Sequence, residues 1–110
     1  MKKLGFIGVG NMGEAVLKGV ISSKKVAREN ILVRNSSDNS TKKVAERNGV
    51  QATNSSKDLA KECDIVFLGV KPYLIASVLE EIKAELEGKI IISMAAAVEI
   101  KDIESIVPNA

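Results

Sequence analysis

The segment Gly8-Val9-Gly10-Asn11-Met12-Gly13 constrains the fold of this chain more than any other feature. It follows the apolar run 4–7, and Met12, Ala15, Val16 and Val20 then recur at helical spacing, which predicts the buried face of a helix. Between a strand and a helix, the first glycine permits a tight turn, the second lets a ligand approach the backbone, and the third lets the helix pack closely on the strand. The amides at the start of such a helix attract an anion, so the segment predicts a pyrophosphate-binding turn.

The rest of the chain alternates between strand-like and helix-like segments. Strands are expected at residues 3–7, 30–34, 50–53, 64–70 and 89–93, with helical segments between them and a short amphipathic helix at 100–106. This alternation predicts an α/β fold, a doubly wound parallel sheet of the Rossmann type with strand order 3-2-1-4-5. Residues 1–110 are then one dinucleotide-binding domain.

Several residues are expected to begin or end helices. Gly49 ends the helix predicted at 41–48, and either Ser55 or Ser56 caps the next one. Pro72 suits the first position of a helix, where its missing N–H costs nothing. That helix carries a stripe of core-facing residues: Ile75, Val78, Leu79, Ile82 and Leu86.

Composition excludes several classes of function. The net charge is only +2 and aromatic residues make up 3% of the chain, which argues against a nucleic-acid partner. No apolar run approaches the roughly 20 residues that cross a membrane, and the glycine-broken start does not suit a signal peptide, so a cytoplasmic location is the default expectation. Histidine is absent, and the single Cys63 is expected to be a small buried hydrophobe. No catalytic residue and no metal site is predicted, so a cofactor must carry any chemistry.

Ligands of such sheets bind at the carboxyl ends of the strands. An NAD site usually has Asp or Glu about 20 residues past the glycines, but here the second strand ends in Arg34, Asn35, Ser36 and Ser37. A guanidinium and hydroxyls attract a 2′-phosphate that a carboxylate would repel, and each charge-assisted hydrogen bond contributes about 1.5–3 kcal/mol. NADP is therefore favoured, with NAD possible. The alternative is that Arg34 is a solvated strand-end residue and the serines form an ordinary loop and cap.

Two further strand ends are expected to meet the nicotinamide. Lys71 either faces the cofactor or packs its stem on the sheet with its ammonium in water. Pro72 fixes the loop below the ribose, and the small residues of segment 94–97 form either a shelf beside the flat ring or plain core packing.

Three segments together resemble a known family. Residues 6–12 (Phe-Ile-Gly-Val-Gly-Asn-Met), 67–72 (Phe-Leu-Gly-Val-Lys-Pro) and 93–98 (Ser-Met-Ala-Ala-Ala-Val) are similar to the cofactor domain of pyrroline-5-carboxylate reductase, and the resemblance covers essentially the whole chain. The first segment is shared with many reductases, whereas the other two together are much more specific.

The resemblance implies reduction of the imine of 1-pyrroline-5-carboxylate to proline, with hydride from NADPH or NADH. The imine can already carry its proton, so the hydride step needs orientation more than a protein acid. By motif, the implied cofactor contacts are Ile7, Gly8, Val9, Gly10, Asn11 and Met12 at the pyrophosphate, Arg34, Asn35 and Ser36 at the adenosine ribose, Ser56 near the adenine, and Gly69, Val70, Lys71, Pro72, Met94, Ala95 and Ala96 at the nicotinamide.

The chain departs from the family in two respects. Ala97 stands where family members commonly have glycine, which puts a backbone turn in doubt. The family also continues into a sixth strand and a C-terminal helical domain, which forms the homo-oligomer and most of the site for the substrate carboxylate. This chain ends at Ala110, where that strand would begin. We therefore expect it to bind cofactor but to turn over poorly or not at all alone.

Other functions are compatible with parts of this pattern. A Rossmann reductase of the β-hydroxyacid dehydrogenase type shares the start of the chain, although Val70-Lys71-Pro72 argues against it. A non-catalytic NADP(H)-binding module is a second alternative. A methyltransferase that uses S-adenosylmethionine is a third, and cofactor titration separates it because that ligand has no pyrophosphate.

Overall fold

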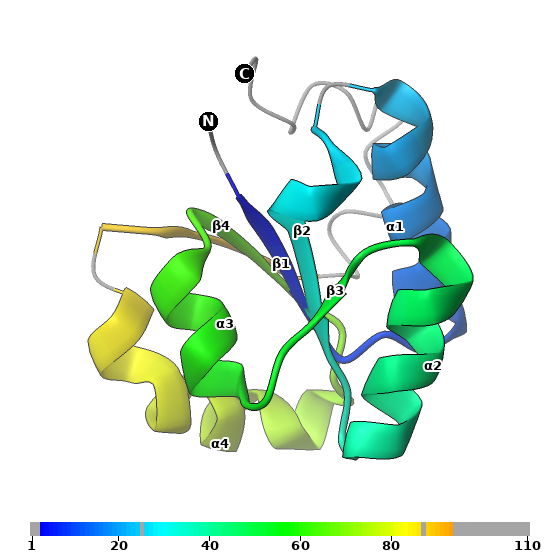
Figure 1. Ribbon diagram of the computed structural model, residues 1–110. Coiled ribbons are helices and arrows are strands. Elements are labelled where there is room, and N and C mark those ends of the chain that lie inside the picture. The colour runs from blue at the N-terminus through cyan, green and yellow to red at the C-terminus, as the bar shows by residue number, and fades with distance from the viewer. Residues whose placement is uncertain (1–2, 25, 87, 94–110) are drawn as a thin grey trace.

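The structure is a computed structural model that describes residues 3–24, 26–86 and 88–93. Its centre is a five-stranded parallel sheet with the order β3-β2-β1-β4-β5 (Figure 1). The strands are β1 (Leu4–Ile7), β2 (Ile31–Arg34), β3 (Gln51–Ala52), β4 (Ile65–Leu68) and β5 (Ile90–Ser93). The predicted strand order is thus confirmed, and β1 lies in the middle of the sheet, paired with β2 on one side and β4 on the other.

Helices cover both faces of the sheet, as in a doubly wound fold. They are α1 (Asn11–Ser23), α2 (Asp38–Asn48), α3 (Ser56–Glu62) and α4 (Pro72–Ile82), with short 3-10 turns at Arg28–Asn30 and Lys83–Leu86. In Figure 1, α1 and α2 lie on one side of the sheet and α3 and α4 on the other. The predicted helix at 100–106 lies outside the described residues.

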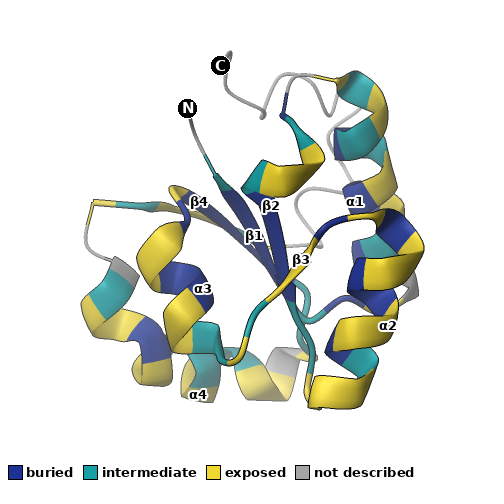
Figure 2. Cartoon of the chain, viewed as in Figure 1, coloured by how far each residue is buried: buried dark blue, intermediate teal, exposed yellow. Residues whose placement is uncertain are grey.

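Alternate residues of the central strands form two separate cores. Leu4 and Phe6 of β1 pack with residues of α1 and α2, whereas Ile7 of the same strand packs with residues of α3 and α4. The rings of Phe6 and Phe67, which are partners in the β1–β4 register, stack with their centroids 4.6 Å apart. Figure 2 shows the result: β1, β2 and β4 are buried, while the helices expose their outer faces. A strand buried on both sides explains why these segments read as continuous apolar runs.

Most of the expected helix ends are confirmed. Gly49 ends α2 with a φ of 69°, and Pro72 is the first residue of α4. Of the two serines offered as a cap for α3, Ser55 is the cap, since its side chain accepts a hydrogen bond from the amide of Asp58. The start of α2 was predicted too late: Ser37 caps it, so the helix begins at residue 38 instead of 41.

The buried faces of the helices follow the prediction with two exceptions. In α1, Ala15 is exposed and Leu17 is fully buried, because the helix turns residues 16, 17 and 20 toward the sheet. In α4, Ile82 is fully buried and Val78 and Leu79 pack against the core, but the α-helix ends there and Leu86 lies in the 3-10 turn that follows.

Cys63 is the small buried hydrophobe that the sequence predicts. It is fully buried against α3 and the sheet, and burial raises the pKa of its thiol to about 12. A thiol with so high a pKa is protonated at neutral pH, so it is not a nucleophile.

Candidate functional site

A cleft of about 540 Å³ opens over the carboxyl ends of β1, β2 and β4. It is lined by Ile7, Gly8, Val9 and Gly10 after β1, by Arg34, Asn35 and Ser36 after β2, by Gly69, Val70 and Lys71 after β4, and by Ser40, Ser56, Tyr73, Leu74 and Val78 from the helices. Residues far apart in the sequence therefore meet where the fold places a ligand.

Gly8 joins two of these strand ends. Its φ is 83°, and a Cβ at this position would lie 2.7 Å from the amide nitrogen of Val70 and 2.8 Å from the carbonyl carbon of Gly69. Hydrogen bonds fix the turn on both sides, since Gly8 donates to the Arg34 carbonyl at 2.8 Å and Gly69 donates to the Ile7 carbonyl at 2.7 Å. Only glycine satisfies both the conformation and the close approach.

Gly10 is different, because it faces open space. It is the N-cap of α1, it is exposed, and a Cβ built on it meets no described atom within 4 Å. No side chain caps the helix, so amides of its first turn remain available for another acceptor. A ligand can thus approach the backbone here without displacing the protein.

Asn35 holds the glycine turn from the end of β2. Its side-chain oxygen accepts a hydrogen bond from the amide of Val9, and its side-chain nitrogen donates to the Val9 carbonyl at 3.3 Å. Its own amide donates to the hydroxyl of Thr41 at 2.8 Å, and that hydroxyl donates to the Ser37 carbonyl. Asn35 lines the cleft, where it is predicted to contact the adenosine ribose, and both ends of its side-chain amide also bind the turn.

Arg34 is not a solvated strand-end residue. Its side chain is only 15% exposed, and its Nη1 donates to the carboxylate of Asp38 at 2.7 Å and to the carbonyl of Thr53 at 3.2 Å. Ser36 and Ser40 line the same end of the cleft. The guanidinium thus reaches the place expected for a 2′-phosphate, but it is already paired with a carboxylate.

The other end of the cleft is apolar and open. Tyr73 and Leu74, in the first turn of α4, are 76% and 40% exposed. Lys71 lines the cleft just before them and is also exposed.

Some predicted contacts cannot be placed as side chains. Asn11 and Met12 begin α1 and Pro72 begins α4, but only their backbones are described. Met94, Ala95, Ala96 and Ala97 lie outside the described residues.

The sequence analysis missed four residues that line the cleft: Ser40, Tyr73, Leu74 and Val78. Ser40 was assigned to a loop, and the cap at Ser37 was the signal that would have placed it in the first turn of α2. Tyr73 and Leu74 lie off the core-facing stripe of α4, directly after the helix-starting proline. Large apolar residues at exposed positions of a first turn beside a strand end were the signal for them.

A hydrogen-bonded carboxylate ties α1 to α2 behind the glycine turn. Glu14 accepts two hydrogen bonds from the Arg47 guanidinium, at 2.7 and 3.0 Å, and one from the Asn48 amide at 2.8 Å. These bonds, those of Arg47 first, lower the pKa of Glu14 from 4.5 to about 2. The carboxylate is therefore ionised throughout the ordinary pH range.

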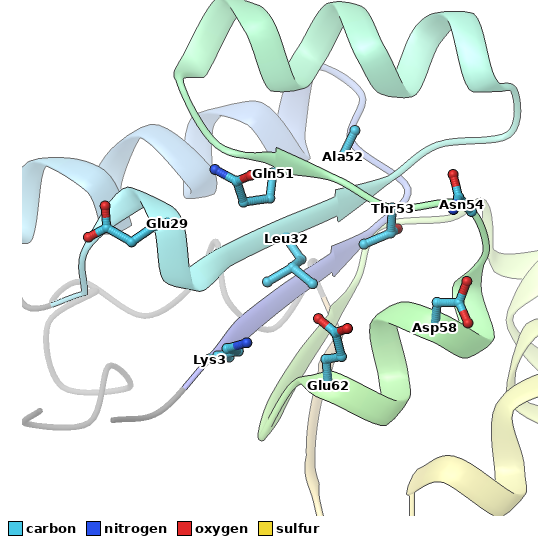
Figure 3. Close-up of a pocket in the computed structure, with 9 residues that line it drawn as sticks. All are labelled: Lys3, Glu29, Leu32, Gln51, Ala52, Thr53, Asn54, Asp58 and Glu62. Atoms are coloured by element: carbon cyan, nitrogen blue, oxygen red, sulfur yellow. The ribbon is translucent and has the colours of Figure 1, made fainter.

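Two other hollows contain none of the predicted site residues. One, of about 450 Å³, lies between β3 and α3, and its lining combines Lys3 with the acidic residues Glu29, Asp58 and Glu62 (Figure 3). The other lies between α1 and α2. In the described ranges no group of three or more metal-binding side chains is assembled, and no helix there is long and apolar enough to cross a membrane.

Comparisons with known proteins agree with this geometry. The chain is 40% identical over 107 residues to pyrroline-5-carboxylate reductase 3 of Danio rerio, and 37% identical over 103 residues to pyrroline-5-carboxylate reductase of Escherichia coli. These alignments cover 96% and 93% of this chain. Among solved structures, the pyrroline carboxylate reductase of Plasmodium falciparum with NADP bound superposes with a TM-score of 0.74 and 33% identity over 96% of this chain.

The chain spans only 37 to 38% of the length of these three relatives. The resemblance inferred from the three sequence segments is confirmed. The profile of the family described as NADP oxidoreductase, coenzyme F420-dependent, matches residues 3–97. This chain therefore belongs to that family of NADP oxidoreductases.

Proposed function

We propose that this chain is the cofactor-binding domain of a pyrroline-5-carboxylate reductase and binds NADP(H) in the cleft over β1, β2 and β4. The observation that carries the proposal is the open backbone at Gly10, at the start of α1, in the middle of a cleft lined by three strand ends. Helix amides without a side-chain cap offer hydrogen bonds to a pyrophosphate there. The relatives named above support the choice of reaction.

The two ends of the cleft suit the two halves of the cofactor. Arg34, Ser36 and Ser40 supply a cation and hydroxyls at the β2 end, where a 2′-phosphate is expected. Val70, Tyr73 and Leu74 supply apolar surface at the β4 end, where a flat ring is expected. The predicted contacts Asn11, Met12, Asn35, Ser56, Gly69, Lys71, Pro72, Met94, Ala95 and Ala96 remain part of the proposal.

NADPH or NADH held in this cleft would supply the hydride that reduces the protonated imine of 1-pyrroline-5-carboxylate to proline. The chain contributes position: the glycine turn holds the pyrophosphate, and the joined turns after β1 and β4 fix the distance to the ring. The apolar side chains of Tyr73 and Leu74 exclude water beside it. No described side chain of the cleft is required as an acid, because the imine nitrogen is already protonated in the reactive form.

The properties of the whole protein are proposals of the same kind. We propose that it is a homo-oligomer, that it acts in the cytoplasm and that it does not bind nucleic acid. The small net charge of +2 supports the last point. The lengths of the relatives support a substrate-carboxylate site outside these 110 residues, with NADPH preferred and NADH accepted.

Titration of the 110-residue chain with NADPH, NADH and S-adenosylmethionine tests the proposal, with nicotinamide fluorescence or calorimetry as the measurement. Both nicotinamide cofactors should bind, and S-adenosylmethionine should not. Turnover of 1-pyrroline-5-carboxylate by these 110 residues should be very slow, because the proposal puts most of the substrate-carboxylate site outside them. Binding of S-adenosylmethionine without binding of NADPH would overturn the proposal. Turnover at ordinary enzyme rates would contradict the expectation that this chain alone is poorly active.

Gly10→Ala is the matched variant for this titration. A methyl group at Gly10 meets no described atom, so the expected cost to the fold is only that of alanine in place of glycine at the N-cap of α1, about 0.5–1 kcal/mol. The same methyl occupies the space proposed for the pyrophosphate, so NADPH and NADH should both bind at least about tenfold more weakly, a difference of roughly 1.4 kcal/mol. Unchanged affinity would place the cofactor elsewhere.

A further inference from the structure

We propose that Asp38 sets the preference between NADPH and NADH by occupying the guanidinium of Arg34. The inference rests on the proposed function, because it assumes that the 2′-phosphate of NADPH lies at the β2 end of the cleft. Its starting point is the ion pair between Arg34 Nη1 and Asp38 Oδ1, with a separation of 2.7 Å. Asp38 thus places a carboxylate next to the one cation that lines this end of the cleft among the described residues.

Arg34 does not need Asp38 for its position. Its side chain is only 15% exposed, and the same Nη1 also donates to the carbonyl of Thr53 at 3.2 Å. Packing and a backbone acceptor therefore hold the guanidinium at the mouth of the cleft. Asp38 is 89% exposed, on the first turn of α2, so it contributes charge rather than packing.

The net charge of the Arg34–Asp38 pair decides whether Asp38 strengthens or weakens cofactor binding. A 2′-phosphate would meet Arg34 and Asp38 as a neutral pair instead of a free cation, and the carboxylate would repel it. NADH carries a hydroxyl at the same position, and a nearby carboxylate can accept its hydrogen bond. Asp38 therefore lowers affinity for NADPH without lowering affinity for NADH.

Removing the charge should shift the preference toward NADPH. Exposed ion pairs usually change equilibria by a few-fold, and a doubly charged phosphate feels a larger effect, so Asp38→Asn should tighten NADPH by about threefold to tenfold. Binding of NADH should change by less than about twofold, the size of an ordinary surface substitution. The NADPH gain should shrink in high salt, because the groups are exposed. Arg34→Ala should do the opposite, weakening NADPH and leaving NADH nearly unchanged.

Asp58→Asn is the matched control. Asp58 also lies in the first turn of a helix, α3, and it lines the hollow of Figure 3 rather than the cleft. Its substitution makes the same change in net charge and in helix-end electrostatics. It should leave the ratio of NADPH to NADH affinity unchanged, which separates a local effect of Asp38 from a general effect of charge.

The measurement is the dissociation constant of each cofactor for the 110-residue chain and its three variants, at low and high salt, with thermal unfolding recorded for each protein. A selective, salt-sensitive gain in NADPH affinity for Asp38→Asn supports the inference. An unchanged ratio would overturn it, and a selective loss of NADPH affinity would show that Asp38 positions Arg34 instead. If the unmodified chain binds neither cofactor, the proposed function fails and this inference fails with it.

Discussion

The two ends of the cleft are built in opposite ways. At the β2 end, the side chain of Arg34 binds Asp38 and Thr53. Asn35 binds the Val9 backbone through its side chain and Thr41 through its backbone amide. At the β4 end, Val70, Tyr73 and Leu74 present apolar surface, and Tyr73 is largely open to solvent. One end is held in shape by polar bonds within the protein, while the other offers area that a ligand can bury.

This difference separates the two sources of affinity. A hydrogen-bonded wall is already ordered before a ligand arrives, so a charged group that binds there does not have to order it. An exposed apolar wall contributes when a ring covers it, in proportion to the area removed from water. We expect substitutions at the first end to change either the fold or the choice of cofactor, and substitutions at the second end to change binding alone.

The largest effect is expected where the two ends meet, at Gly8. Gly8→Ala forces a side chain into a left-handed backbone and against the backbone of Gly69 and Val70. The conformational cost of about 1–2 kcal/mol and the overpacking cost of about 1–3 kcal/mol together predict a loss of roughly 3 kcal/mol in the free energy of unfolding. Urea unfolding measures it, and Gly10→Ala is the control that should not show it. Equal stability of the two variants would remove the distinction between the two glycines.

The next effect tests the polar end alone. Asn35→Ala removes both hydrogen bonds to Val9 and leaves the Val9 amide without its partner, which predicts a loss of about 1–3 kcal/mol in stability. Because the glycine turn loses its support, NADPH and NADH should weaken by the same factor. Titration with both cofactors measures this. A loss confined to NADPH would mean that Asn35 contacts the 2′-phosphate directly.

A smaller and pH-dependent effect is expected at Glu14, which ties α1 behind the polar end. Its pKa is lowered from 4.5 to about 2, so its contribution to stability is fully present above about pH 5 and is lost as the pH falls through 2. Glu14→Gln should cost about 1–2 kcal/mol at neutral pH, since hydrogen bonds to a charged acceptor become bonds to a neutral one. Urea unfolding between pH 7 and pH 2 should show the two proteins converging in acid. A constant difference across that range would contradict the assignment.

The smallest effect on the fold is expected at the apolar end. Tyr73 is 76% exposed, so Tyr73→Ser should change stability by no more than about 0.5 kcal/mol. If the nicotinamide covers this side chain, NADPH and NADH should both weaken by a few-fold. ADP-ribose, which has no nicotinamide, should bind the variant and the unmodified chain equally. A similar loss for ADP-ribose would place the adenosine half at this end and reverse the comparison.

The order of the sheet could be predicted from the sequence because it depends on local signals. Apolar runs of four residues indicate the strands, Pro72 indicates a helix start and Gly49 indicates a helix end. Each signal depends only on residues close by in the sequence. The parallel order then follows from the right-handed crossovers. The start of α2 was missed because hydroxyl residues suit both a loop and a helix cap, and only the bond from Ser40 to Ser37 distinguishes them.

The sequence predicted which strand ends form the site, but not which atoms bind one another there. Sequence position brought Arg34, Asn35 and Gly8 to one edge of the sheet, since the carboxyl ends of parallel strands lie together. Which atoms bind one another depends on side-chain rotamers and on residues that are distant in sequence, such as Val9 with Asn35 and Arg34 with Thr53. Through these pairings, a residue predicted to contact the ribose also supports the turn, and the predicted phosphate ligand is paired with a carboxylate.

The contact between Gly8 and the turn after β4 also limits how the domain can move. Gly69 donates to Ile7 and Gly8 donates to Arg34, so three strand ends are joined through backbone atoms alone. No side chain can rotate to loosen this joint, and a hinge between the phosphate and nicotinamide positions would have to break the hydrogen bond from Gly69 to Ile7. Closure around a bound dinucleotide must therefore come from the side chains and segments around the joint. The joint itself keeps the distance between the turns after β1 and β4 fixed, so every ligand of the cleft has to fit that distance.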